Sequence, residues 1–144
     1  MKTAIVYYSE HHGNTKKLLD KIAEKYPVTL IDITAEPHPE LSGYDRVGFA
    51  SGIYFSKLHK SLIAAAGTLP ENKEVFFIYT CGAQKQGYTS AIRSAALKQN
   101  AKILGEYGCL GFDTYGPFKL IGGIAKGHPD ADELEKACDF YGEL

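Results

Sequence analysis

Two kinds of hydrophobic pattern alternate along the chain, and they predict different elements. Short apolar runs rich in β-branched and aromatic residues predict five strands, at 2–8, 28–33, 46–51, 74–80 and 102–110. Stretches in which apolar residues recur every three or four positions predict four helices, at 14–26, 56–66, 89–100 and about 129–141. Strands that alternate with helices indicate a parallel sheet covered on both faces. We therefore predict an α/β fold with three layers (helix, sheet, helix) around a five-stranded parallel sheet.

Two stretches fit neither pattern. Residues 34–44 contain Pro37 and Pro39 and predict a loop. Residues 111–128 show no sustained period, and an irregular run of this length in a small domain is often functional. No internal repeat, linker or low-complexity stretch divides the chain, so residues 1–144 are expected to form a single domain.

Composition narrows the classes of function. The net charge of −1 and the pI near 6.5 argue against a nucleic-acid or membrane-surface protein. No apolar run approaches the roughly 20 residues that span a bilayer, and the N-terminus enters a strand directly, so we expect neither a membrane segment nor a signal peptide. The widely spaced Cys81, Cys109 and Cys138 are expected to be reduced thiols, which predicts a cytoplasmic protein.

Three loops would share one edge of such a sheet, after the first, third and fourth strands. The first loop, 9–15, is rich in small and hydroxyl-bearing residues and leads into a helix, where backbone N–H groups and the helix dipole favour an anion such as phosphate. Loops 51–55 and 81–88 each combine glycine with an aromatic residue, which suits a flat conjugated ligand. Asn14 and Thr15 would equally serve as ordinary helix-capping residues.

These residues make the chain resemble the flavodoxin family. The family's Ser/Thr-rich first loop, which ends in Gly-Asn-Thr, is matched by Ser9 and by Gly13-Asn14-Thr15. The runs 111–119 and 127–129 also resemble a branch of flavodoxin-domain proteins. The resemblance covers essentially the whole chain. It implies the flavodoxin-like strand order 2-1-3-4-5, noncovalently bound FMN and one- or two-electron transfer.

The resemblance also implies which residues bind the cofactor. The FMN phosphate would be held by the first loop, through Ser9, Gly13, Asn14 and Thr15. The second loop would lie along one side of the flavin ring, with Tyr54 the favoured stacking partner among Ser51, Gly52, Ile53, Tyr54 and Phe55. The third loop would line the pyrimidine side through Cys81, Gly82 and Ala83, with Tyr88 at the far edge. No catalytic side chain and no metal ligand is predicted.

The sequence departs from the family pattern in two loops. His11 and His12 replace small hydroxyl residues of the first loop, where an imidazole N–H would donate to the phosphate or bond to the backbone. The third loop lacks acidic residues and carries Lys85, which predicts a less reducing flavin if this charge faces the ring rather than solvent. Cys81 would either tune the ring or fill a buried strand end.

Other doubly wound proteins are excluded by specific residues. The third strand ends in Ser51-Gly52, so it lacks the acceptor aspartate of a receiver domain. Neither the first loop nor Cys81 and its following residues supplies the Cys-x₅-Arg loop of a small tyrosine phosphatase, and the phosphate loop of nucleotide triphosphatases is absent.

Three functions stay open for a flavodoxin-like chain. An electron carrier needs only an exposed flavin edge and redox partner proteins, and would work as a monomer or weak dimer. A quinone or nitro-compound reductase needs a further site for a nicotinamide cofactor, for which no dinucleotide fingerprint is present. A binding module without FMN would follow if the altered first loop held the phosphate poorly. The sequence favours the carrier.

Overall fold

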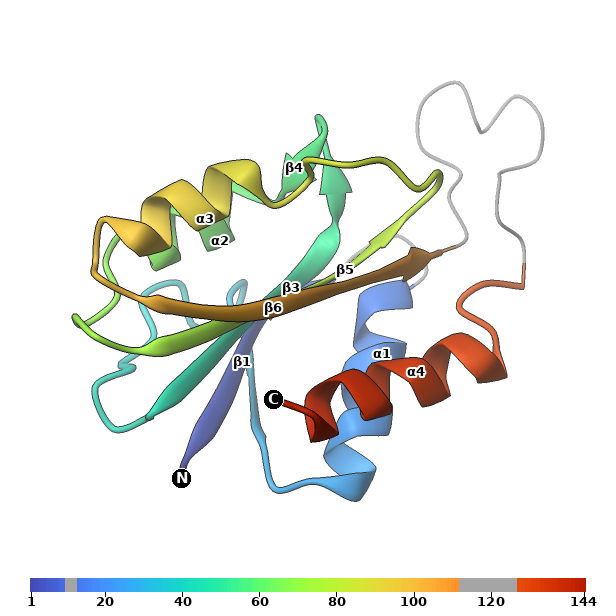
Figure 1. The fold of residues 1–144 in the computed structure, drawn as a ribbon, viewed down its shortest axis with the longest axis horizontal. Coiled ribbons are helices and arrows are strands. Elements are labelled where there is room, and N and C mark those ends of the chain that lie inside the picture. Colours follow the sequence, from blue (N-terminus) through green and yellow to red (C-terminus); the bar gives the residue numbers. More distant parts are fainter. Residues whose placement is uncertain (10–12, 112–126) are drawn as a thin grey trace.

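A parallel sheet forms the centre of the molecule, with two helices on each face (Figure 1). This computed structural model describes residues 1–9, 13–111 and 127–144. The parallel strands follow the order β2 (Thr29–Asp32), β1 (Thr3–Tyr8), β3 (Arg46–Tyr54), β5 (Glu74–Cys81) and β6 (Lys102–Leu110). Since β5 and β6 are the fourth and fifth of the predicted strands, the predicted order 2-1-3-4-5 is confirmed.

Each face of the sheet buries a separate apolar cluster. Helices α2 (Lys60–Ala66) and α3 (Ser90–Leu97) cover one face, and α1 (Asn14–Lys25) and α4 (Ala131–Gly142) cover the other (Figure 1). Side chains alternate along each strand, so Phe77 packs in the first cluster while its neighbours Phe76 and Ile78 pack in the second. Burial on both faces explains why the strands are apolar nearly throughout.

The helix ends follow from local sequence. Pro27 disfavours a helical conformation for the residue before it, and Tyr26 is extended, so α1 ends at Lys25. Helix α4 begins after Asp130, which forms a capping box with Glu133. Within the described ranges, no helix is both long and apolar enough to cross a bilayer.

The predicted helix at 56–66 is wrong at its start. Lys57–Leu58 instead form a short strand, β4, which pairs antiparallel with Ile53 and Tyr54 at the end of β3, and α2 begins only at Lys60. The two turn residues, Phe55 and Ser56, both have positive φ, at 53° and 65°. The sequence predicted the helix from about Ser56, but α2 is capped by His59, whose side chain accepts a hydrogen bond from Ser61 N.

Two strand glycines are required by close packing. A methyl group at Gly48 would overlap the ring of Phe76, and one at Gly108 would overlap the ring of Tyr79. Both rings come from the neighbouring strand β5, so large aromatic residues on β5 are accommodated by missing side chains on β3 and β6. This pairing of large and small residues lets the aromatic rings pack closely against the neighbouring strands.

Candidate cofactor-binding site

The first loop leaves the start of α1 open to an anion. Gly13 is the N-cap residue, in a left-handed conformation with φ 63°, and none of the described residues comes within 4 Å of the position that its Cβ would occupy. Ser9 Oγ accepts a hydrogen bond from Lys16 N at 3.2 Å. Among the described residues, no acidic side chain lies in the first turn of α1. The positive end of the helix dipole is therefore not neutralised by an acidic side chain there.

Helix α4 gives a comparison within the same molecule. Its first turn contains Asp132 and Glu133, and its cap residue Asp130 accepts from Glu133 N at 2.9 Å. Backbone N–H groups at the start of α4 thus donate to carboxylates of the helix itself and its cap residue. Of these two helices, α1 is the one whose start suits an external anion, because it has a glycine cap and two lysines, Lys16 and Lys17, in its first turn.

Asn14 and Thr15 are buried where α1 meets the ends of β5 and β6. The hydroxyls of Thr15 and Thr80 lie 2.9 Å apart and share a hydrogen bond. A Cβ at Gly111 would lie 2.9 Å from Asn14 Nδ2 and 3.0 Å from the Cβ of Thr80, so the helix start packs closely on the strand ends. A hydroxyl has one hydrogen and two acceptor lone pairs. If Thr80 donates, the Thr15 hydrogen is left for a phosphate oxygen.

The second loop is tied to α2 by Ser51 and His59. Ser51 is fully buried, and its Oγ accepts from His59 N at 3.1 Å and donates to Gly52 O at 2.6 Å. The hydroxyl of Ser51 is therefore used within the protein, so any ligand contact of this residue would come from its main chain. The His59 imidazole in turn holds the start of α2.

An aromatic cluster at the end of β1 supports the hairpin formed by β3 and β4. The rings of Tyr8 and His59 stack with centroids 3.6 Å apart and planes 8° apart. The Tyr54 ring meets both edge-on, at 5.7 Å from Tyr8 and 5.1 Å from His59. Tyr54 is thus held in place and only partly exposed, whereas the neighbouring Phe55 is 86% exposed.

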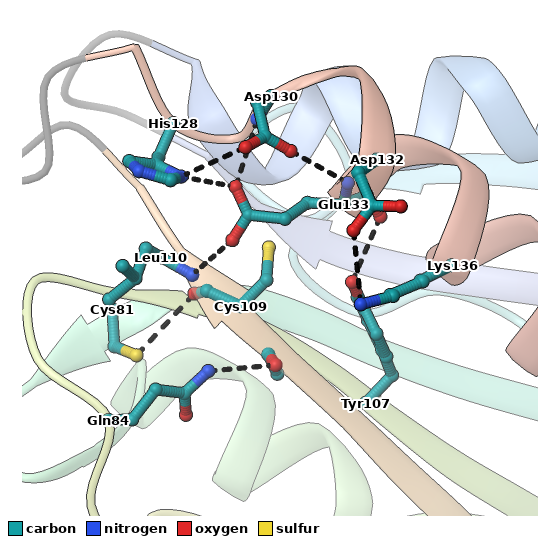
Figure 2. Close-up of polar contacts among 11 residues, drawn as sticks. Cys81, Gln84, Tyr107, Cys109, Leu110, His128, Asp130, Asp132, Glu133 and Lys136 are labelled. Atoms are coloured by element: carbon teal, nitrogen blue, oxygen red, sulfur yellow. Dashed lines mark hydrogen bonds and ion pairs between the residues drawn. The ribbon is translucent and has the colours of Figure 1, made fainter.

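The third loop is closed by its own side chains. Tyr88 is buried, donates its hydroxyl hydrogen to Ala83 O at 2.8 Å and packs edge-on against Tyr79. Gln84 Nε2 donates to Gly108 O at 3.0 Å, which fastens the loop to β6 (Figure 2). Tyr88, predicted at the far edge of the flavin, therefore has a structural role within the loop, and its contact with a ligand stays a prediction.

Burial favours the protonated form of the two cysteines near this edge. Cys81 Sγ donates to Cys109 O at 3.4 Å, and all three cysteines are free and buried, as predicted for reduced thiols (Figure 2). Burial raises the pKa of Cys81 to about 11 and that of Cys109 to about 12, with the Glu133 carboxylate adding to both shifts. A reactive thiolate is therefore not favoured at either position.

A polar cluster joins the end of β6 to the start of α4 (Figure 2). The Glu133 carboxylate accepts from Leu110 N at 3.2 Å and from Asp130 N at 2.9 Å, and it contacts His128 Nδ1. The hydrogen bond to Glu133 raises the pKa of His128, although burial opposes the shift. His128, Asp130 and Glu133 lie close enough to hold a metal ion. Their mutual hydrogen bonds instead account for the arrangement as a link between β6 and α4.

The structure brings the three predicted loops to one edge of the sheet. Tyr8 pairs with Ser51, and Gly52 pairs with Thr80, so the ends of β1, β3 and β5 lie side by side. His11 and His12 lie outside the described residues, as does most of the irregular run 111–128. Their predicted roles stay predictions.

Three residues of this edge were missed by the sequence reasoning. Tyr8 and Thr80 looked like ordinary strand residues, and His59 looked like a helix residue. A polar Thr80 inside an otherwise apolar strand was the available signal for a partner near the strand end. No signal pointed to the stacking of His59 on Tyr8, because that contact joins residues 51 positions apart (59 minus 8).

Comparison with known families identifies the chain. The flavodoxin-domain family matches residues 5–116. The chain belongs to this family. An uncharacterized protein of Methanocaldococcus jannaschii is 38% identical over 143 residues, which cover 97% of this chain and 95% of that protein. The resemblance inferred from the first loop is thus confirmed at the level of the family.

Solved structures of flavodoxin-like proteins share the fold. Oxidised flavodoxin 2 from Bacillus cereus superposes with a TM-score of 0.66 and 16% identity, over 96% of this chain and 94% of that one. An NADPH-quinone reductase from P. pentosaceus gives a TM-score of 0.65 and 16% identity, over 99% of this chain and 96% of that one. A flavoprotein from Lactobacillus acidophilus, solved in complex with FMN, gives a TM-score of 0.56 and 15% identity, over 75% of this chain and 93% of that one.

Proposed function

We propose that this flavodoxin-domain protein binds FMN and carries electrons between redox partner proteins. The single observation that carries the proposal is the start of α1, where a glycine cap and an absence of acidic residues in the described first turn leave a site for the FMN phosphate. The flavodoxin family and the FMN complex of a flavoprotein with the same fold support the choice of cofactor. Bound FMN supplies one- or two-electron redox chemistry.

The first loop would bind the phosphate by hydrogen bonds and the helix dipole. Ser9 and Thr15 bring hydroxyls to the start of α1, and both hydroxyls are already oriented by the protein, one by Lys16 N and one by Thr80. Preoriented donors lose little conformational entropy on binding. Gly13 has no side chain to obstruct the helix start, so a phosphate would be able to approach the backbone N–H groups.

The flavin ring would lie between the second and third loops. Tyr54 is held edge-on by Tyr8 and His59, which fixes the orientation of its ring before a ligand binds. Gly52 and Ile53 precede it on β3, and Cys81, Gly82 and Ala83 lie at the end of the adjacent β5. These residues would offer a flat aromatic surface on one side and backbone groups on the other.

The protein's proposed setting follows from the same features. We place the carrier in the cytoplasm, because its three cysteines are free thiols. Its partners would be redox proteins rather than nucleic acid or membranes, since its net charge is only −1. A monomer or weak dimer is sufficient, because electron transfer needs only an exposed edge of the flavin.

A second candidate is a small FMN-dependent quinone or nitro-compound oxidoreductase. The observation in its favour is the matching fold of the NADPH-quinone reductase from P. pentosaceus. The carrier is preferred because no dinucleotide fingerprint is present in the sequence. Steady consumption of NADPH by FMN-loaded protein, with a quinone as acceptor, would favour the oxidoreductase over the carrier.

Ligand titration tests the cofactor proposal directly. FMN and riboflavin carry the same ring, but only FMN carries the phosphate. We expect FMN to bind at least tenfold more tightly than riboflavin in a fluorescence-quenching titration, because charge-assisted hydrogen bonds contribute about 1.5–3 kcal/mol. Equal affinities would show that the start of α1 does not bind the phosphate, and no binding of either ligand would reject the flavin site.

A further inference from the structure

Positive charge gathers around the hairpin that carries Phe55. Lys57 lies on β4, Lys60 is the first residue of α2, and Lys85 lies on the third loop; all three are exposed. Strand β4 contacts α3, which follows the third loop, so these elements occupy one side of the sheet edge (Figure 1). We call Phe55, Lys57, Lys60 and Lys85 the basic surface.

Among the residues that the structure describes, carboxylates are scarce on the elements that carry the basic surface. Between Val47 and Gly105 the only acidic residues are Glu71 and Glu74, which lie before and at the start of β5, at the opposite end of the strand from the site. Glu106 lines a surface hollow of about 390 Å³ beside Lys85, but its carboxylate is bonded to Arg93 and Thr89. Exposed acidic residues gather instead on α4, and Asp32 lies at the end of the edge strand β2.

Phe55 gives the basic surface an apolar centre. Its side chain is 86% exposed, and both Phe55 and Ser56 adopt the left-handed conformation. That conformation is sterically unfavourable for a residue with a side chain. Strained, exposed aromatic residues are typical of ligand and partner contacts, because the strain is tolerated where the side chain must be presented.

We propose that the basic surface docks a redox partner protein whose own contact face is acidic. This inference rests on the proposed electron-carrier function, because the surface borders the loops that would hold the flavin ring. The lysines would attract an acidic partner over a distance and orient it, and Phe55 would supply the desolvated apolar contact at the centre. The acidic side of the molecule, around α4, would face away from the partner.

Reaction with small charged oxidants measures the charge at this surface. The FMN-loaded, reduced protein is mixed in a stopped-flow instrument with ferricyanide, an anion, or with tris(phenanthroline)cobalt(III), a cation. For the double variant Lys57→Glu/Lys60→Glu, we expect the ferricyanide rate to fall roughly tenfold at low ionic strength and the cobalt rate to rise. Added salt should remove both differences.

A matched control separates local charge from net charge. Lys98→Glu/Lys102→Glu changes the net charge by the same four units, from the end of α3 and the start of β6. Its rates should stay within about twofold of the wild type, because these lysines lie at the other end of the sheet. If both double variants change the rates equally, or neither does, the docking proposal is wrong even though FMN is bound.

A second measurement does not depend on the flavin. Poly-L-glutamate is added at low salt to the cofactor-free, ¹⁵N-labelled protein, and amide shifts are followed by NMR. We expect the largest shifts at residues 55–60 and 84–86 and their loss in Lys57→Glu/Lys60→Glu. Shifts centred on Lys98 and Lys102 would overturn the proposal. So would self-association that depends on Lys57 and Lys60, or tighter binding to a DNA duplex than to poly-L-glutamate.

Discussion

At the scale of single residues, hydroxyl groups do most of the positioning at the site. Ser51, Thr15 and Thr80 are buried. Each hydroxyl forms a hydrogen bond with a residue that lies elsewhere in the sequence. Gly13 stands at the cap position of α1 but has no side chain, so the hydroxyl of Ser9 accepts the hydrogen bond from Lys16 N instead. A hydroxyl both donates and accepts, so it can bridge a structural partner and a ligand with one small side chain.

Removal of a first-loop hydroxyl should weaken FMN binding selectively. Ser9→Ala and Thr15→Ala are each expected to lower FMN affinity roughly tenfold and to leave riboflavin affinity within twofold, because only the phosphate contact is lost. Fluorescence titration with both ligands measures the effect. Ser94→Ala, at an exposed position on α3, is the control and should change neither affinity. Unchanged FMN affinity in both first-loop variants would reject the phosphate assignment.

The contact of His128 with Glu133 should make stability depend on pH. The pKa of His128 is raised in the folded protein, so its contribution is present in full below the unfolded value, about 6.5, and is lost as pH rises through the folded value. His128→Gln should therefore lower the free energy of unfolding more at pH 6 than at pH 8.5 in urea denaturation. His38→Gln, in the exposed loop at 34–44, controls for the loss of a histidine. A larger loss at pH 8.5 would contradict the assignment.

At the scale of elements, the hairpin between β3 and α2 is the feature that distinguishes the site. Its two turn residues, Phe55 and Ser56, are left-handed without being glycine, and the aromatic cluster of Tyr8, Tyr54 and His59 packs beside them. Tight two-residue hairpins prefer asparagine and glycine at such positions. The hairpin therefore contains a strained turn, and Phe55 lies exposed within it.

Glycine at the second turn position should stabilise the protein. Ser56→Gly is expected to raise the free energy of unfolding by up to about 1 kcal/mol, because glycine adopts positive φ without a steric cost. Ser94→Gly, in the interior of α3, should lower it by roughly 0.5 kcal/mol, the difference in helix propensity between serine and glycine. Urea denaturation should therefore show changes of opposite sign in the free energy of unfolding of the two variants. A destabilised Ser56→Gly would show that the serine side chain itself supports the turn.

At the scale of the whole molecule, two separate apolar clusters make the site edge rigid. The sheet is buried on both faces, and Gly48 and Gly108 allow the rings of Phe76 and Tyr79 to pack against neighbouring strands. The strand ends that carry the three loops are thus fixed by a core on each side. The loops themselves can then differ from those of other flavodoxin-domain proteins without changing the fold.

FMN should raise the thermal stability of the whole domain. A ligand that binds only the folded state stabilises it by about 2.7 kcal/mol at a concentration of 100 Kd. We expect Tm to rise with FMN concentration and to rise less with riboflavin at equal concentration, because riboflavin lacks the phosphate. Differential scanning calorimetry measures both shifts. The same Tm with and without excess FMN would contradict the proposed site.

The sequence alone determined the layers of this protein. Strands buried on both faces must be apolar throughout, and an amphipathic helix must repeat its apolar residues every three or four positions, so both are visible locally. The helix start at Gly13-Asn14-Thr15 was visible for the same reason, since a helix start is marked by consecutive residues. The family followed from that loop and was confirmed.

Only the tertiary structure decided how the site is supported. His59 caps α2 and stacks on Tyr8, Thr80 bonds to Thr15, and Glu133 holds the end of β6. Each of these contacts joins residues far apart in sequence, and no local pattern encodes such a pair. The strained turn at Phe55 was hidden as well, because it depends on the pairing of Lys57–Leu58 with the end of β3, whereas the local sequence predicted a helix from about residue 56.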